Sequence, residues 1–190
     1  MAKRVYFAFH YQDVIDFRAN VVRNHNGLSS SQEAGYFDGS IWETAKTTSD
    51  LALKRMINSE LVGTSVTAVL VGSQTHARRW VRYEIMKSLE KGNSLIAIHI
   101  NSISGKDKLA KSLGPNPFAN LGLVIADDGV TARPTKWKND KWVYYNDLNA
   151  FKVPKQPAAR CGKNLPLTTW LPIYDWVASD GYKNFQTWIS

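Results

Sequence analysis

The sequence predicts an α/β domain built on a mainly parallel central sheet. Three short apolar runs have the length and composition of buried strands: residues 5–9, 65–72 and 95–100. The segments that precede or separate them carry apolar residues at helical spacing: residues 14–23, 50–61 and 75–91. Parallel strands need crossover connections, and helices are the usual crossovers, so this alternation favours a parallel sheet.

Length and composition fit one globular domain. A chain of 190 residues buries roughly 70% of the surface that its unfolded form exposes, which is enough for a core without metal or disulfides. The single cysteine, Cys161, indicates a reducing environment. Residues 1–4 run directly into the first apolar run, which leaves no room for a signal peptide, and no apolar run approaches the roughly 18 residues of a membrane span. We therefore expect a cytoplasmic protein.

The charge is basic, with 24 Lys and Arg against 16 Asp and Glu. Nucleic acid is the first partner to consider for such a balance. The basic residues are scattered, however, and their densest group is Arg78, Arg79 and Arg82. A solvated basic surface is the ordinary interpretation, and a phosphate-bearing small molecule is the next. We expect no nucleic-acid partner.

The first predicted elements are a strand, a helix and a long loop. The strand at residues 5–9 leads through a polar segment into the helix at 14–23. Residues 24–39 are rich in Asn, Gly and Ser, so we expect a long loop with at most a short strand around Tyr36-Phe37. Long loops in compact domains are often functional.

The next elements carry clear helix signals. Ser49 is a good N-cap for the helix at 50–61, which ends at Gly63. After the strand at 65–72, the helix at 75–91 stops at Gly92, and the strand at 95–100 follows.

The pattern weakens beyond Asn101. Residues 102–117 indicate an irregular connection, and 137–145 a small hairpin turning at Asn139-Asp140. Residues 170–189 suggest a terminal helix, packed on the sheet and broken near Gly181. We therefore predict a single domain over residues 1–190, in which 1–101 form the core βαβ units and 102–190 an elaborated C-terminal region.

Several common chemistries lack their motifs. The chain has no phosphate-binding P-loop, no dinucleotide-binding glycine pattern after the first strand and no hydrolase nucleophile elbow. The four histidines show no metal-ligand spacing, so we expect no metal site. His99 lies inside an apolar strand, where a hydrogen-bonded core histidine is the ordinary interpretation.

The helix at 75–91 carries the most informative pattern. Val81, Ile85 and Leu89 form its buried stripe, and Trp80 and Glu84 lie one turn apart on an adjacent flank. That flank can border the crevice at the carboxyl ends of the strands, where open α/β sheets bind ligands. By spacing alone, a packing pair at the edge of the core remains the ordinary alternative.

Two longer segments resemble a known family. They are R-V-Y-F-A-F-H-Y-Q-D at residues 4–13 and V-L-V-G-S-Q-T-H-A-R-R-W-V-R-Y-E-I at 69–85. Both are similar to Toll/interleukin-1 receptor (TIR) domains, which carry W-C-x-x-E on the helix after a central strand. Trp80 and Glu84 match this motif, and Val81 replaces its cysteine. The resemblance implies a flavodoxin-like TIR fold with helices on both faces of the sheet.

Further segments resemble the TIR proteins of the Thoeris bacterial antiphage defence system. They are F-H-Y-Q-D-V-I-D-F-R, W-E-T-A-K-T-T-S-D-L-A-L-K-R, R-R-W-V-R-Y-E-I-M-K-S and Y-D-W-V-A-S-D-G-Y. The likeness covers nearly the whole chain and is weakest over residues 24–35 and 102–160. It implies an enzyme that cleaves the nicotinamide bond of NAD and forms a cyclic ADP-ribose isomer, which activates a second defence protein.

The resemblance also implies roles for single residues. Glu84 would be the catalytic carboxylate and Trp80 a ring on which nicotinamide stacks. Phe9 and His10 would line the crevice, and Asp38 would meet a ribose hydroxyl. NAD would be the substrate, with no cofactor, and the partner effector would be reached through the diffusible product, with self-association on activation. Two alternatives stay open: a non-catalytic TIR interaction module, and an enzyme like the nucleoside deoxyribosyltransferases.

Overall fold

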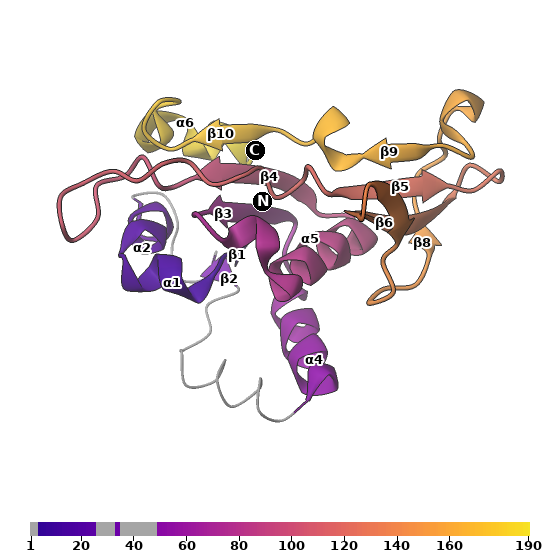
Figure 1. Ribbon diagram of the computed structural model, residues 1–190, viewed down its shortest axis with the longest axis horizontal. Helices are drawn as coiled ribbons and strands as arrows, with labels where there is room; N and C mark the ends of the chain where they lie inside the picture. The colour runs from indigo at the N-terminus through magenta and orange to yellow at the C-terminus, as the bar shows by residue number, and fades with distance from the viewer. Residues whose placement is uncertain (1–3, 26–32, 35–48) are drawn as a thin grey trace.

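The computed structural model describes residues 4–25, 33–34 and 49–190. Its central sheet is wholly parallel, with strand order β10-β4-β3-β1-β2 (Figure 1). The strands are β1 (Val5–Ala8), β2 (Glu33–Ala34), β3 (Val66–Val71), β4 (Ser94–His99) and β10 (Ile173–Asp175). The predicted α/β class with a parallel central sheet is confirmed.

Both faces of this sheet are buried, because side chains alternate between two core clusters. The first core cluster takes Tyr6 and Ala8 from β1 and Val69 and Val71 from β3. The second takes the side chains between them, including Val5, Phe7, Ala68 and Leu70. Every residue of β1 and β3 is buried, as the apolar runs predict.

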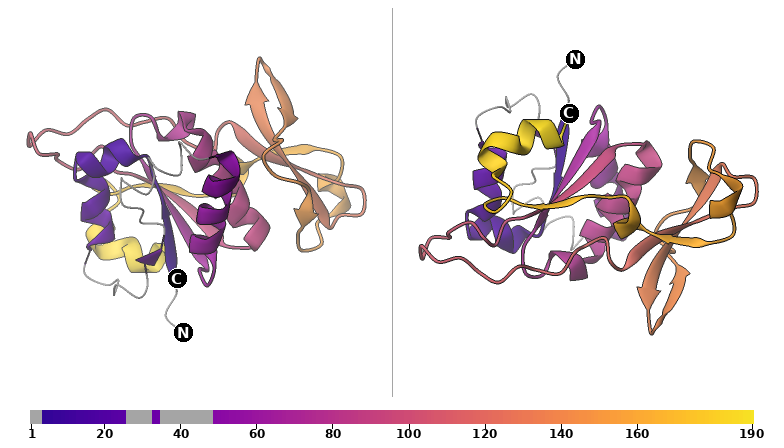
Figure 2. Two further views of the ribbon diagram at one scale, coloured as in Figure 1. Left: turned by 90° about the horizontal axis from the view of Figure 1, so that it is seen from below. Right: turned by 90° about the horizontal axis from the view of Figure 1, so that it is seen from above.

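Helices cover both faces, as the resemblance implies. The first core cluster contains side chains of α4 (Asp50–Leu61) and α5 (Arg79–Lys91). The second contains side chains of α2 (Arg18–Arg23) and α6 (Gly181–Trp188). Figure 2 shows α4 and α5 on one side of the sheet, with α1 (Tyr11–Ile15), α2 and α6 on the other.

Two expected helices begin or divide differently from the prediction. The segment predicted as one helix over 14–23 is split into α1 and α2, because Phe17 has a left-handed backbone with φ 63°. The segment predicted as a helix from Thr75 has a single 3-10 turn at Thr75–Ala77 before α5 begins at Arg79. The Ser49 cap is confirmed, since its side chain accepts a 3.1 Å hydrogen bond from the Ala52 amide.

A second, antiparallel sheet occupies the region where the sequence indicated only a connection and a hairpin. Its strands are β5 (Leu121–Ile125), β6 (Thr131–Lys138), β7 (Lys141–Tyr144), β8 (Phe151–Lys152) and β9 (Asn164–Pro166). Their order is β7-β6-β5-β9, and β8 also pairs with β6. The hairpin at Asn139-Asp140 is confirmed, with φ of 50° and 57° at its two turn residues. Leu121, Leu123 and Ile125 join the first core cluster, so the two sheets share a core.

The prediction of a terminal helix over 170–189 is wrong in its first half. Residues 173–175 form β10 beside β4, and only residues 181–188 are helical. Trp176 lies in the segment that joins β10 to α6, and its side chain is fully buried. Gly181 is the first residue of α6 and packs against this ring. A larger residue would not fit there, because its Cβ would lie 2.4 Å from Trp176 Cε3.

Some expectations fall on residues that the structure does not describe. The short strand at Tyr36-Phe37 and the site residue Asp38 both lie outside the described residues. Within the loop predicted for 24–39, residues 33–34 form β2 next to β1. No helix in the described ranges is both long and apolar enough to span a bilayer.

Candidate active site around Glu84

Glu84 lies in the middle of α5, on the part of the helix that packs against the sheet. Val81 and Ile85 form the predicted buried stripe, with exposed fractions of 3% and 0%, and Leu89 is partly buried. Glu84 is just as inaccessible, at 3%. The expected flank beside an open crevice is therefore closed over the carboxyl group in this conformation.

The side chain of Glu84 meets Tyr6 of β1. The Tyr6 hydroxyl donates a hydrogen bond of 2.6 Å to Glu84 Oε1. Glu84 Oε2 is also buried, and no hydrogen-bond partner for it occurs among the described residues. Burial raises the pKa of Glu84 to about 8, while the hydrogen bond from Tyr6 acts in the opposite direction. The Glu84 carboxyl group is thus more easily protonated than that of an exposed glutamate.

Trp80 lies one turn before Glu84 and packs partly buried against the first core cluster. The Arg79 guanidinium sits 4.7 Å from the centre of its ring, and Tyr83 meets the ring edge-on at 5.9 Å. The indole therefore already has a cation on it, the same kind of contact that a nicotinamide cation would make.

Two of the basic residues near Trp80 have partners within the protein. Arg79 forms ion pairs of 2.7 Å with both Asp50 and Asp147. Arg82 donates through Nε to the carbonyl of His76 at 3.0 Å. Arg79 and Arg82 thus connect α5 to its neighbours.

Phe9 and His10 directly follow β1, as expected, but the Phe9 side chain does not approach Glu84. Phe9 belongs to the second core cluster, with Arg23 positioned 5.9 Å from its ring centre. Its side chain is therefore on the opposite face of the sheet from the Tyr6 and Glu84 pair. His10 follows directly and is half-buried.

Asp13 is a second buried carboxyl group, at the carboxyl ends of β1 and β3. It is 7% exposed, and its Oδ2 lies 3.2 Å from the Thr75 hydroxyl. Burial raises the pKa of Asp13 to about 6. The same Thr75 oxygen accepts a 2.9 Å hydrogen bond from the Gly72 amide. Asp13 was not among the site residues predicted from the sequence, although α1, which carries it, follows the carboxyl end of a buried strand, where open α/β sheets bind ligands.

The comparison with protein families places this site in a known context. The model of the family "Thoeris protein ThsB, TIR-like domain" matches residues 6–104. The chain belongs to this family. The match spans β1 to β4 and so includes Tyr6, Asp13, Trp80 and Glu84.

A curated relative extends the likeness beyond the family match. It is ThsB1 of Bacillus cereus (strain MSX-D12), which is provisionally named a cyclic ADP-D-ribose synthase. The two sequences are 55% identical over 192 aligned positions that cover the whole of both chains. The second sheet is thus part of the shared length, although it lies outside the residues matched by the TIR-like domain.

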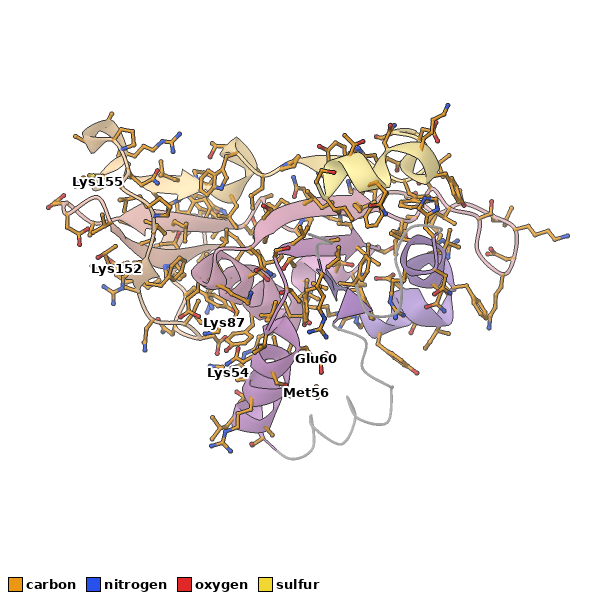
Figure 3. All side chains as sticks on the ribbon, turned by 180° about the vertical axis from the view of Figure 1, so that it is seen from behind. Lys54, Met56, Glu60, Lys87, Lys152 and Lys155 are labelled. Atoms are coloured by element: carbon orange, nitrogen blue, oxygen red, sulfur yellow. The ribbon has the colours of Figure 1, made fainter. Side chains whose placement is uncertain are left out.

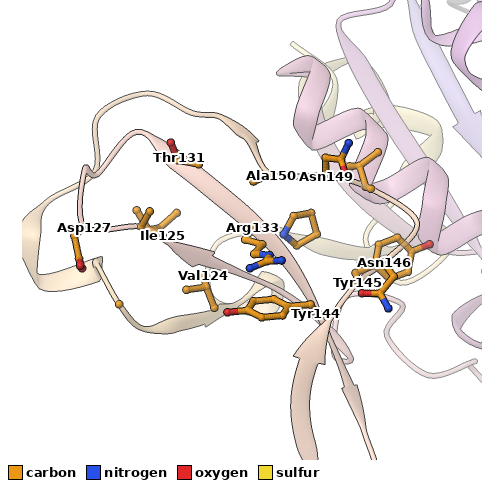
Figure 4. Close-up of a pocket in the computed structure, with 14 residues that line it drawn as sticks. Val124, Ile125, Asp127, Thr131, Arg133, Tyr144, Tyr145, Asn146, Asn149 and Ala150 are labelled. Atoms are coloured by element: carbon orange, nitrogen blue, oxygen red, sulfur yellow. The ribbon is translucent and has the colours of Figure 1, made fainter.

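The second sheet of this TIR-like chain carries a groove of about 630 Å³ (Figure 4). Val124, Ile125 and Pro134 line it, and the Arg133 guanidinium lies 3.8 Å from the ring centre of Tyr144. A smaller cavity of about 340 Å³ lies where the C-terminal end of α5 meets this sheet. Neither cavity is lined by Glu84.

An ion pair links one wall of the larger groove to α5, the helix that carries Glu84. Asp147 lies in the segment that lines the groove and pairs with Arg79 of α5. It also pairs at 3.2 Å with Lys54 of α4, which Figure 3 labels. Together with Arg79, Asp147 links α4, α5 and the second sheet through charges.

Proposed function

We propose that this chain consumes NAD, cleaves its nicotinamide glycosidic bond and closes the remaining ADP-ribose into a cyclic isomer in antiphage defence. The observation that carries this proposal is the full-length identity of 55% with a protein provisionally named a cyclic ADP-D-ribose synthase. The buried Glu84 carboxyl, within the matched TIR-like residues, supplies a chemical group suited to the reaction.

One carboxylate is sufficient for the bond cleavage. Nicotinamide leaves as a neutral molecule from a cationic pyridinium, so its departure needs no general acid, unlike glycoside hydrolysis. The ionised Glu84 holds the ribose hydroxyls and stabilises the positive charge that develops at the anomeric carbon. Its burial strengthens that interaction, because little water is present to screen it.

Four further residues complete the proposed substrate site. Trp80 offers the ring for nicotinamide, and its position one turn from Glu84 supports this role. His10 contributes from the end of β1, Phe9 supports that strand end from the second core cluster on the opposite face of the sheet, and Asp38 binds a ribose hydroxyl. We propose that NAD binds without a metal or other cofactor.

Ring closure depends on holding the adenosine ribose close to the anomeric carbon. A hydroxyl of the adenosine ribose attacks the anomeric carbon as the bond to nicotinamide breaks, and the hydroxyl proton is released. A hydroxyl held in place competes with water through its high effective concentration. The diffusible product then activates a partner effector in the cytoplasm, and the enzyme self-associates when activated.

The test compares Glu84→Gln with Glu90→Gln, a matched change on the same helix at an acid that pairs with Lys87. Each protein, purified from phage-triggered cells, is incubated with NAD, and the products are analysed by chromatography and tandem mass spectrometry. Loss of a preorganised charge of this kind costs about 2.7–4 kcal/mol in the transition state, so Glu84→Gln should release nicotinamide at least about 100-fold more slowly. Glu90→Gln should match the wild type.

The product decides between the alternatives. A product with the mass of ADP-ribose less one water, formed with one nicotinamide per turnover, supports the proposal. Linear ADP-ribose as the main product would leave NAD cleavage standing and contradict the cyclase. No nicotinamide release favours a non-catalytic interaction module, and base exchange on a nucleoside favours an enzyme like the deoxyribosyltransferases.

A further inference from the structure

We infer that Tyr6 is a positioning residue for Glu84: its hydroxyl holds Oε1, favours the ionised carboxylate and leaves Oε2 for the substrate. This inference rests on the proposed function. The contact joins the middle of β1 to the middle of α5, so the carboxyl group is fixed by the sheet as well as by its own helix.

The hydroxyl of Tyr6 is not needed for packing. The other residues of β1 are Val5, Phe7 and Ala8, so Tyr6 is the polar exception in an apolar strand. Its exposed fraction is 0%, and burying a phenol hydroxyl without a partner is costly. The 2.6 Å bond to Glu84 removes that cost, whereas a phenylalanine would fill the same space without it.

The two carboxylate oxygens of Glu84 have different environments. Oε1 accepts from Tyr6, whereas Oε2 is buried with no hydrogen-bond partner among the described residues. A buried acceptor that lacks a partner is unfavourable unless something else occupies the position. A substrate ribose hydroxyl would supply the missing donor, and Tyr6 determines which oxygen is left for it.

Among the residues that the structure describes, few ionisable groups influence the pKa values of Tyr6 and Glu84. Burial and the Tyr6 hydrogen bond determine the pKa of Glu84, and they act in opposite directions. Burial and the charges of Glu84 and Glu60 of α4 raise the pKa of Tyr6 well above 10, so the phenol keeps its proton. Removing the hydroxyl should therefore raise the pKa of Glu84 further.

The first test is the pH profile of nicotinamide release. The rate should rise as Glu84 loses its proton, and in Tyr6→Phe the midpoint of that rise should move up by about one pH unit, with roughly ten-fold less activity at neutral pH. The matched control is Tyr83→Phe, which also removes a hydrogen bond from a buried tyrosine, in this case to Asn58 at 3.1 Å. It should leave the midpoint unchanged.

A second variant is expected to shift the midpoint in the opposite direction. Replacing Tyr6 with 3-fluorotyrosine keeps the ring and makes the hydroxyl a stronger donor, so the midpoint should move to lower pH. If Tyr6 has only a packing role, Tyr6→Phe should be less stable, and the midpoint of the pH profile should be the same in every variant. That result would overturn the inference.

The last test does not depend on NAD. The unfolding free energies of wild type and Glu84→Gln are compared across pH, in the presence of Tyr6 and in the Tyr6→Phe background. The advantage of Glu84→Gln should grow between about pH 4.5 and 8 with Tyr6 present, and should continue to grow at higher pH without it. Identical pH ranges in the two backgrounds contradict the inference. If the wild type releases no nicotinamide, the proposed function fails separately, and this comparison still decides whether Tyr6 tunes Glu84.

Discussion

Asp13 occupies the space that a side chain at Gly72 would need. A Cβ added to Gly72 would lie 1.9 Å from Asp13 Oδ1, and the Asp13 carboxyl is buried and held by Thr75. The glycine at the end of β3 therefore allows the carboxyl group to rest directly on the backbone between two strands.

Gly72→Ala should destabilise the fold by roughly 1–3 kcal/mol, because the added methyl group overlaps a side chain that has little room to move. Chemical denaturation of the single and double variants measures this. Adding Asp13→Ala should recover part of the loss, giving a non-additive cycle. Strict additivity of the two changes would contradict this account of the contact.

Asp13 should also make stability depend on pH. Its pKa is raised to about 6 in the folded protein, against 3.8 for the free side chain. The folded state therefore binds the proton more tightly, and its stability falls as pH rises from about 4 to 6. Asp13→Asn, followed by thermal unfolding across this range, should gain stability relative to the wild type as pH rises. A constant difference across the range would contradict the prediction.

Asp147 should have the opposite pH dependence. Its hydrogen bonds from Arg79 and Lys54 lower its pKa to about 2. The stability it contributes is present above about pH 4 and disappears as pH falls toward 2. Asp147→Asn should cost up to about 1 kcal/mol at neutral pH, since Arg79 is half exposed and screened by water. For comparison, Asp127→Asn, at an exposed position, should change stability by less than about 0.5 kcal/mol.

Trp80 offers a test of substrate binding. If nicotinamide stacks on the indole, Trp80→Leu should raise KM for NAD more than Trp80→Phe, which keeps an aromatic face. Steady-state kinetics of both variants, at a temperature where both are folded, measure this difference. Equal KM values for the two variants would show that the ring does not bind the substrate.

The predictable parts of the fold are those with strong local signals. The apolar runs of β1 and β3, the Ser49 cap and the Asn139-Asp140 turn each carry their own pattern. The second sheet could not be predicted in this way, because β9 is three residues long and is defined by its pairing with the distant β5. Strand β10 is equally short and depends on β4.

The residues of the candidate site could likewise be predicted from the sequence only in part. Glu84 and Trp80 were proposed because a helical motif places them one turn apart. Tyr6 was not, because its contact with Glu84 joins residues 78 positions apart in the chain and follows no linear spacing. The opposite placement of Phe9 follows from strand alternation, which sends successive residues of β1 to different faces and continues into Phe9, the residue after Ala8.

The strand order also has a consequence for synthesis on the ribosome. Strand β4 receives its outer neighbour only from β10, which follows the entire second sheet in the chain. A nascent chain that has already emerged as far as β9 therefore still carries an uncapped, apolar strand edge. Such an edge readily pairs with other chains. Emergence of β10 is thus the step that covers this edge of the central sheet.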